Sequence, residues 1–315
     1  MEQLPLASVI IPVYNRAHLI ERCLDSVAAQ TYRPLEVVIV DNNSTDNTLE
    51  TIRNWIASCH SNKISFQVDL CKEQGAAAAR AFGENLTTGK YLFFFDSDDT
   101  MRKDYVESAM TIFSRYPDTD IVGWRVMFHY LNGNKRVSHI WKPNNSVDNH
   151  LINAIFRTQG YAVKREILHK AGNWNPEVMV WDDWELGIRL LLTEPEIKVI
   201  DHVSADVYSQ EESITGTGFT PKAGKWEEIL DLAERTILAS QHRDKLHMAR
   251  VVVYRRAILA ALYTREGHKE LARPLMKKAL ASPLIDRKAR LALQFAYRYT
   301  AAGGRGAFRI IGKLL

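Results

Sequence analysis

Tyr91-Leu92-Phe93-Phe94-Phe95-Asp96-Ser97-Asp98-Asp99 is the stretch that decides how this chain folds. Its apolar half predicts a buried strand, and its second half places three carboxylates within four positions. Because burying charge is costly, acids clustered at a strand end are expected to line a crevice and to face positive charge. A divalent cation that holds a phosphorylated ligand is one candidate. The alternative is a solvated turn before an acid-rich helix N-terminus, which Thr100 and Asp104 would fit.

Upstream of this stretch, apolar runs alternate with segments of helical spacing. Continuous apolar runs predict buried parallel strands, and segments with one apolar helical face predict the helices that cover them. This βαβα order predicts an α/β fold with a doubly wound, mostly parallel sheet. The predicted strands are 8–13, 35–40, 64–70 and 91–95, and the predicted helices are 18–30, 76–86 and one that Thr45-Asp46 caps.

Polar residues follow three of these predicted strands at the point where each strand ends. Tyr14-Asn15 follows the first strand, Asp41-Asn42-Asn43 ends the second, and Asp96-Ser97-Asp98 ends the fourth. Ligands of doubly wound sheets bind at the carboxyl ends of the strands. The recurrence of acids and amides at this edge therefore predicts a binding site.

The middle and the end of the chain follow other patterns. Asn132-Gly133-Asn134 between two strand-like runs predicts a small antiparallel hairpin, since this turn demands positive φ. From residue 225 onward the pattern is helical, with a helix pair around Gly267. The predicted elements are hairpin strands 121–131 and 135–141, helices 151–156, 182–192 and 257–281 (the pair), and strands 160–164 and 196–207.

Composition sets further bounds on a chain of 315 residues. Its three cysteines are scattered, which argues against a zinc site or a disulfide framework and suits a reducing cytosol. Neither a signal peptide nor an apolar run of bilayer length is found, so we expect a cytoplasmic protein. From residue 241 onward, 17 Lys and Arg stand against 4 Asp and Glu. Such a basic region predicts peripheral contact with the anionic inner face of the plasma membrane, with nucleic acid not expected; a solvated helical surface is the alternative.

Five segments, in order and at fitting spacing, resemble glycosyltransferase family 2. The resemblance covers roughly residues 5 to 215 and implies a GT-A fold, a nucleotide-sugar donor, a divalent metal and inversion at the anomeric carbon. It implies a nucleotide-sugar-binding and catalytic domain at 1–220, while the helical pattern and the basic charge beyond it predict an α-helical basic region at 221–315. The five segments are Ser8–Asn15, Val38–Asp46, Gln74-Gly75 with Ala79-Arg80, Asp96–Asp99 and Asp182–Leu186.

The resemblance also implies roles for single residues. Tyr14 can stack on the donor base, Asp41 can accept a base N–H, and Arg80 can reach phosphate. Asp98, with Asp96, is the expected ligand of Mn²⁺ or Mg²⁺. The residues implied in donor binding are Pro12, Tyr14, Asn15, Asp41, Arg80, Asp96, Ser97 and Asp98.

The Asp182-Asp183 pair lies at the head of a predicted helix and matches the family's acidic motif. Asp183 is the expected general base, which takes the proton of the acceptor hydroxyl, and Asp182 is its partner. The alternative is that both acids only complement the helix dipole. Trp181 and Trp184 flank the pair, and we expect one to form an apolar platform for an acceptor sugar and the other to pack in the core.

The chain departs from the family pattern at two positions. Asn42 stands where the family often has an acid, which predicts altered base or ribose recognition. Gln210 stands where many members have a histidine near Ser213-Ile214-Thr215, which leaves a third metal ligand open. The motif of processive synthases is also missing after the Asp182-Asp183 helix, so we expect addition of a single sugar.

These residues predict a metal-dependent inverting glycosyltransferase that moves one sugar, with UDP as the expected nucleotide, to a glycan or lipid-linked acceptor in surface polysaccharide synthesis. The alternative is a non-catalytic nucleotide-sugar-binding scaffold or sensor, which the departures at Asn42 and Gln210 motivate. A nucleotidyltransferase would need a glycine-rich, lysine-bearing loop for triphosphate, which the sequence lacks.

Overall fold

The computed structural model describes residues 4–59, 63–138, 141–142, 146–210, 218–304 and 306–307. The chain divides into two compact units. The first comprises residues 1–144 and 155–210, and the second comprises 145–154 and 211–315. Residues 145–154 thus belong with the C-terminal helices, although they lie within the predicted domain 1–220.

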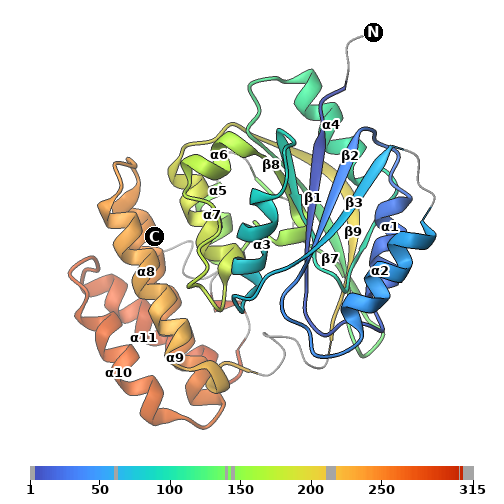
Figure 1. Ribbon diagram of the computed structural model, residues 1–315. Coiled ribbons are helices and arrows are strands. Elements are labelled where there is room, and N and C mark those ends of the chain that lie inside the picture. Colours follow the sequence, from blue (N-terminus) through green and yellow to red (C-terminus); the bar gives the residue numbers. More distant parts are fainter. Residues whose placement is uncertain are drawn as a thin grey trace. The chain divides into compact units, whose positions relative to one another are not determined.

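The first unit is built on one sheet with the strand order β3-β2-β1-β4-β8-β6-β9-β5, and β7 pairs with β6. The first four strands in this order are parallel, which confirms the predicted α/β class (Figure 1). Beyond β4, the pairs β4–β8, β8–β6 and β9–β5 are antiparallel and β6–β9 is parallel. Antiparallel pairing therefore extends beyond the predicted hairpin, which is β6–β7. The strands are β1 (Ala7–Val13), β2 (Leu35–Asp41), β3 (Ile64–Leu70), β4 (Tyr91–Phe94), β5 (Thr100–Met101), β6 (Ile121–His129), β7 (Lys135–Val137), β8 (Tyr161–Lys164) and β9 (Ile197–Tyr208).

Helices cover both faces of the parallel strands, which explains why β1 is buried along its whole length. Alternate residues of β1 and β2 pack against α1, α2 and α4 on one face. Val38 and Val40 face the other way and pack against α3. The helices of this unit are α1 (Ile20–Ala28), α2 (Thr48–Ser58), α3 (Ala76–Asn85), α4 (Tyr105–Arg115), α6 (Arg165–Lys170) and α7 (Asp182–Leu192).

Helix α3 lies unusually close to the sheet because its inward face is small. Three alanines and Gly83 line that face. A Cβ at position 83 would lie 2.6 Å from Ile10 Cγ2 and 2.8 Å from Val40 Cγ2, both closer than real Cβ contacts allow. The small side chains therefore fix the height of α3 above β1 and β2, and with it the position of every residue that α3 carries.

The strand order places a switch point between β1 and β4, since successive strands add on opposite sides of β1. Strand β4 ends at Phe94, and just beyond it Phe95 N donates to the Ile10 carbonyl at 3.0 Å. Pro12, two residues after Ile10 on β1, lies beyond the pairing of β1 with β4, so its missing N–H costs no ladder hydrogen bond to β4. The two strands separate where ligands of such sheets bind.

The predicted hairpin is confirmed as the antiparallel pair β6–β7, with Gly133 at φ +82° in its turn. Its second strand is shorter than predicted, because β7 ends at Val137. Trp141, predicted to lie in that strand, instead packs beside Gly123 and against Phe156.

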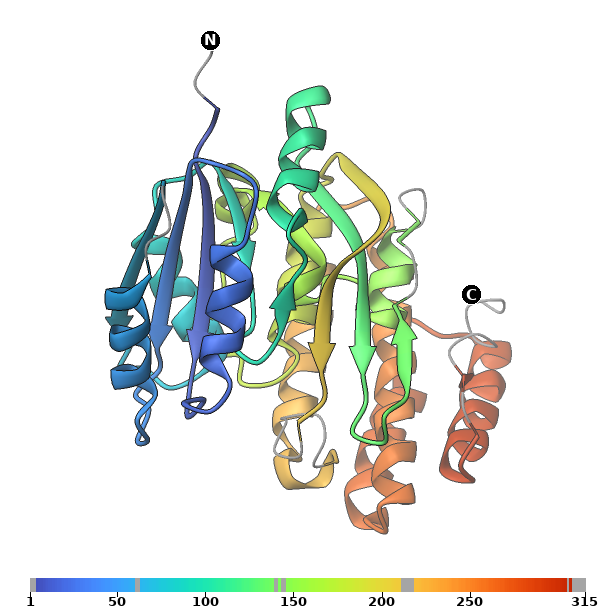
Figure 2. The same ribbon diagram turned by 90° about the vertical axis from the view of Figure 1, so that its right-hand side faces the viewer.

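The second unit is helical, as predicted from residue 225 onward. The predicted pair around Gly267 is confirmed, since Gly267 at φ +96° separates α9 from α10. The short helix predicted at 151–156 begins earlier, at Ser146, and Arg255 of α9 donates to its Leu151 carbonyl at 2.8 Å. The helices of this unit are α5 (Ser146–Asn153), α8 (Lys225–Ala239), α9 (Lys245–Arg265), α10 (Lys269–Ala281) and α11 (Arg287–Ala301) (Figure 2).

Helix α9 is the centre of this unit. Most of its residues are buried on all sides, because α5, α8, α10 and α11 pack around it. Within the described part of the chain, no helix combines the length and the apolar character needed to span a bilayer. The basic tail 308–315, for which we considered membrane contact from the sequence, lies outside the described residues.

Candidate functional site

The turn after β1 is tied to the turn after β2. Asn15 has φ +49°, its backbone N–H donates to Ser44 Oγ at 3.0 Å, and its Oδ1 accepts from Thr45 N at 2.8 Å. Tyr14 is left 46% exposed beside this junction. A half-exposed aromatic ring on a rigid turn can offer its face to a planar base.

Asp41 and Asn42, at the end of β2, are both buried, and both bond to the protein itself. Asp41 Oδ1 accepts from Ser44 Oγ at 2.5 Å. The Asn42 amide donates to the carbonyls of Cys71 (3.2 Å) and Glu73 (2.6 Å), and its Oδ1 accepts from Gly75 N at 2.8 Å. A carboxylate could not donate either of the first two bonds. The structure thus uses the asparagine to hold the connection that leads into α3.

The acids after β4 lie in a dense network. The Gln159 amide donates to Asp96 Oδ2 and to Asp99 Oδ2, both at 2.5 Å, and Asp99 Oδ1 accepts from Tyr208 N at 2.8 Å. Burial first, and then the neighbouring Asp98 and Asp96, raise the pKa of Asp99 well above its usual range. Asp99 is therefore an internal anchor of the turn, and Ser97 is also buried.

Asp98 is more accessible and faces arginine. Arg16 Nε lies 3.5 Å from Asp98 Oδ2, and Arg22 donates to the Asp98 carbonyl at 2.5 Å while its guanidinium lies over the Tyr208 ring. Burial first and Asp96 second raise the pKa of Asp98, and Arg16 opposes them. The shift shows that negative charge is crowded here, a situation that a bound cation would relieve.

Arg80 joins this strand end to the head of α7. Its guanidinium donates to Asp96 Oδ1 at 2.7 Å and to Asp182 Oδ2 at 2.5 Å. It also lies over the ring of Trp174, 4.7 Å from the centroid. The side chain is buried, and the surrounding carboxylates, Asp182 first, raise its pKa further despite the opposing effect of burial. Two acidic motifs that are far apart in the sequence are thus held by one cation.

Asp183 is the second acid of α7 and has a distinct environment. Its Oδ1 accepts from Trp184 N at 2.7 Å. Burial first and the negative charge of Asp182 second raise its pKa to about 7, although Arg80 and Arg157 oppose the shift. A carboxylate whose pKa lies near neutrality suits a general base, because it is available for a proton and still basic enough to take one.

The two tryptophans beside these acids differ in burial. Trp184 is fully buried, whereas Trp181, with φ +51°, is only partly covered and lies edge-on to Trp184 with 5.7 Å between ring centroids. Of the two, only Trp181 has surface to offer an acceptor. Gln210 is described, but residues 211–217, which include Ser213-Ile214-Thr215, lie outside the described residues.

The acidic side chains at this edge are the candidate ligands for a metal. Among the described residues, no group of three or more His, Cys, Asp or Glu side chains is arranged to hold an ion. The partly exposed carboxylates of Asp98 and Asp96 fit a hard cation such as Mg²⁺ or Mn²⁺, which commonly binds one or two carboxylates and completes its shell with phosphate and water. The site thus fits a metal that arrives with its substrate.

The structure adds three residues that the sequence patterns left out. Arg16, in the connection after β1, and Arg22, on α1, both contact Asp98. Gln159 donates a hydrogen bond to Asp96. Arg16 directly follows the Tyr14-Asn15 pair, so its place beside a strand end was a usable signal. Gln159 lies 63 residues from Asp96, and its contact depends on the antiparallel half of the sheet, which no local pattern reveals.

A family model described as glycosyl transferase family 2 matches residues 8–171, more than half of the chain. The chain belongs to glycosyl transferase family 2. The matched residues include all three strand-end motifs and Arg80, and they stop before α7.

Relatives in this family include Glycosyltransferase AglE of Haloferax volcanii, 38% identical over 132 residues, or 41% of this chain and 42% of that protein. Glycosyltransferase GlyA of Streptococcus pneumoniae is 35% identical over 126 residues, or 40% of this chain and 18% of that protein. The PGL/p-HBAD biosynthesis glycosyltransferase Rv2957 of Mycobacterium tuberculosis is 28% identical over 214 residues, 68% of this chain and 80% of that protein. The chain thus spans less than half of the first two relatives.

Solved structures show the same fold. S. aureus TarS 1–349 in complex with UDP-GlcNAc superposes with a TM-score of 0.73 at 18% identity, covering 96% of this chain and 89% of that chain. The mannosyltransferase PcManGT from Pyrobaculum calidifontis, in complex with GDP-Man and Mn²⁺, gives 0.61 at 20% identity, covering 95% and 84%. The predicted GT-A fold is therefore confirmed.

Proposed function

We propose that this family 2 chain is a metal-dependent inverting glycosyltransferase that moves one sugar from a nucleotide-diphosphate sugar to a hydroxyl group. The observation that carries the proposal is the Arg80 link, which holds Asp96 and Asp182 on one guanidinium. It brings an acidic strand end suited to a metal and diphosphate beside an acid suited to proton abstraction. Inverting transfer needs both, one on each side of the sugar that moves.

On the donor side, Tyr14 would stack on the base, and Asp41, Asn15 and Pro12 would complete its surroundings. Asp98, with Asp96, would hold the divalent cation. Arg80, which donates to Asp96, would supply a fixed positive charge beside them. When bound, the cation would stabilise the charge that develops on the departing nucleoside diphosphate. Arg16 and Arg22 would turn from Asp98 toward the phosphates.

On the acceptor side, Asp183 would take the proton from the attacking hydroxyl group. Asp182 is engaged by Arg80, so Asp183 is the acid left to act on a substrate. Trp181 would supply an apolar surface for an acceptor sugar ring, whereas the buried Trp184 supports it from the core.

The proposed substrates follow from the relatives. TarS binds UDP-GlcNAc and PcManGT binds GDP-Man with Mn²⁺, which supports a nucleotide sugar, UDP-linked in our proposal, and Mn²⁺ or Mg²⁺ for this chain. A glycan or lipid-linked acceptor in surface polysaccharide synthesis is the proposed partner. We propose a catalytic domain at 1–220 and a helical region at 221–315 in a cytoplasmic protein that contacts the inner membrane face.

A thermal-shift panel of nucleotide diphosphates and nucleotide sugars, with and without Mn²⁺, tests donor binding, because a ligand of the folded state raises apparent stability. We expect stabilisation by UDP or a UDP-sugar that depends on the metal, and its loss in Asp98→Ala. Asp118→Ala, at an exposed acid of the same unit, is the matched control and should behave as the wild type.

Slow hydrolysis of the stabilising nucleotide sugar should accompany binding if the protein is an enzyme. Metal-dependent stabilisation without hydrolysis or transfer after long incubation would instead support the non-catalytic sensor. A panel in which no nucleotide stabilises the protein would contradict both.

A further inference from the structure

Helix α11 has a buried apolar face and a second row of apolar side chains that are 37% to 61% exposed. Leu293, Ala296 and Thr300 are buried against the rest of the second unit. On the other side, Leu291 is 61% exposed and Phe295 57% exposed, and Tyr299 continues the row one turn later. The Phe295 and Tyr299 rings are stacked with 6.2 Å between centroids. We call Leu291, Phe295 and Tyr299 the α11 strip.

The strip is framed by positive charge. Helix α11 carries Arg287, Lys288, Arg290 and Arg298 and contains no Asp or Glu. All four cations are exposed, and none forms an ion pair with another described residue within 4.0 Å. By contrast, Lys278 of α10 is held by Asp231. Among the described residues, the cations of α11 are thus without an ion pair, although Asp286 caps the N-terminus of the helix.

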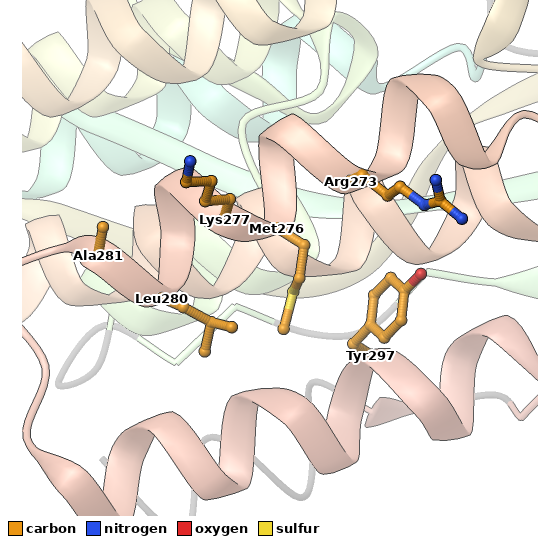
Figure 3. Close-up of a pocket in the computed structure, with 6 residues that line it drawn as sticks. All are labelled: Arg273, Met276, Lys277, Leu280, Ala281 and Tyr297. Carbon is orange, nitrogen blue, oxygen red and sulfur yellow. The ribbon is translucent and has the colours of Figure 1, made fainter.

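A groove lies between α10 and α11 in the same unit. It has a volume of about 510 Å³, and its lining is mostly apolar. Figure 3 shows Met276, Leu280 and Tyr297 pointing into the space between the two helices, with Arg273 and Lys277 on the α10 side. Basic residues thus also border an apolar groove on α10.

We propose that the α11 strip and its cations dock the protein on an anionic lipid bilayer. Single exposed apolar residues are normal on a protein surface, and Leu246 on α9 is one such residue. Three in a row along a helix, together with four exposed cations, are the composition of a helix that lies in a membrane interface. Phe and Leu side chains enter the acyl boundary, while Arg and Lys extend to the lipid phosphates.

A protein partner fits these residues less well. A docking face for protein would present paired or alternating charges, whereas α11 is uniformly basic around an apolar row. The complementary surface must then be continuously anionic, which is the property of a leaflet that contains acidic lipids. This docking rests on the membrane contact of the proposed function and names the residues that make it, and it does not depend on the transfer chemistry of the first unit.

Vesicle co-sedimentation with the full chain tests the proposal. We expect the wild type to bind vesicles of phosphatidylcholine mixed with phosphatidylglycerol, and to bind less as salt is raised. The triple variant Leu291→Gln, Phe295→Gln, Tyr299→Gln should lower the partition coefficient by at least about tenfold, since it removes the apolar contacts. The triple variant Arg287→Gln, Lys288→Gln, Arg298→Gln should remove the preference over vesicles of phosphatidylcholine alone.

Leu246→Gln is the matched control for the first variant, because it changes an exposed leucine of the same unit outside α11. It should bind vesicles like the wild type. Circular dichroism and the nucleotide thermal shift, measured without vesicles, establish that each variant is folded and whether its donor site works. Membrane docking can therefore fail while donor binding persists, and the reverse.

Two outcomes would overturn the proposal. One is wild-type protein that stays in solution with anionic vesicles, or a strip variant that sediments as well as the wild type. The other is a wild type that forms dimers by light scattering, does not bind vesicles, and becomes monomeric in the strip variant, which would make the strip an interface between copies.

Discussion

Two buried arginines, one in each unit, lie in opposite electrostatic surroundings. Arg256 of α9 pairs with Asp231 and Glu234, each at 2.7 Å, and Lys278 adds a second cation on Asp231. There the pKa of Asp231 is lowered despite burial, chiefly by the hydrogen bonds from Lys278 and Arg256. Among these four side chains the charges balance, while Glu227 beside them has a raised pKa through burial first and Asp231 second.

Around Arg80 the acids are less evenly paired. Asp96 and Asp182 accept from two of its five N–H groups, while Asp98 and Asp183 keep raised pKa values although Arg16 and Arg157 oppose the shifts. Excess negative charge held in a partly dry place is costly, and a metal, a phosphate-bound cation or a proton would relieve it. We call the acids around Arg80 the unbalanced cluster and the four side chains around Arg256 the balanced cluster. The position of the unbalanced cluster at the carboxyl ends of parallel strands, and not the buried ion pair itself, indicates a functional site.

The largest expected effect is on turnover. Asp183→Asn removes the proposed proton acceptor and should lower kcat by a factor of about 10² to 10⁴, the range for general base catalysis. Donor binding in the thermal-shift assay should stay close to that of the wild type. Near-normal turnover in this variant would refute the role of Asp183, and loss of donor binding would mean that the substitution had disturbed the donor site.

The same variant should be more stable than the wild type at neutral pH. A carboxyl whose pKa is raised by folding contributes stability that is present below its unfolded pKa of about 3.9 and is lost as the pH rises through its folded pKa of about 7. Asparagine cannot ionise, so the stability of Asp183→Asn relative to the wild type should increase from about pH 4 to about pH 7. Thermal melts of both proteins at pH 4 and pH 8 measure this difference.

Breaking the balanced cluster should affect stability and not chemistry. Arg256→Gln leaves Asp231 and Glu234 without their buried partner and should lower the free energy of unfolding by about 3 kcal/mol, the lower part of the range for such losses, because both acids keep some access to water. Urea unfolding measures the change. A folded variant with wild-type donor binding but normal stability would show that the pair contributes little.

The pH profile of turnover should show the unbalanced cluster directly. Because the base must be ionised, kcat/KM should rise with pH and level off above an apparent pKa of about 7, with a roughly tenfold fall per pH unit below it. Initial rates between pH 5 and pH 9 at fixed metal concentration test this. A profile that is flat through pH 7 would assign the raised pKa no part in the reaction.

The smallest effect is expected at the edge of the balanced cluster. Lys278 is half-exposed, so Lys278→Gln should lower the free energy of unfolding by less than about 1 kcal/mol. Since the pKa of Asp231 is lowered in the folded protein, its stabilisation exists above the unfolded pKa and is lost as the pH falls. The variant and the wild type should therefore converge in acid, which melts at two pH values can show.

Much of the site could be predicted because its acids directly follow apolar strands. Strand burial, the strand-end position of Asp96 and Asp98, and the helix that begins at Asp182 are all local patterns. The contact between Arg80 and Asp182 is not local, since 102 residues separate them and only the finished fold brings them together. For the same reason, the internal role of Asn42 was not foreseen: its partners are carbonyls of a later connection.

The close packing of α3 against β1 and β2 at Gly83 has a consequence for engineering. A library meant to change donor preference would naturally randomise the helix that carries Arg80, yet Gly83 must be held constant in it. Any larger residue at position 83 would clash with Ile10 and Val40 and push α3 away from the sheet. Arg80 would then be displaced from its carboxylate partners while the fold survived. Variants of this kind would be expressed and folded but inactive, and a screen for solubility would not remove them.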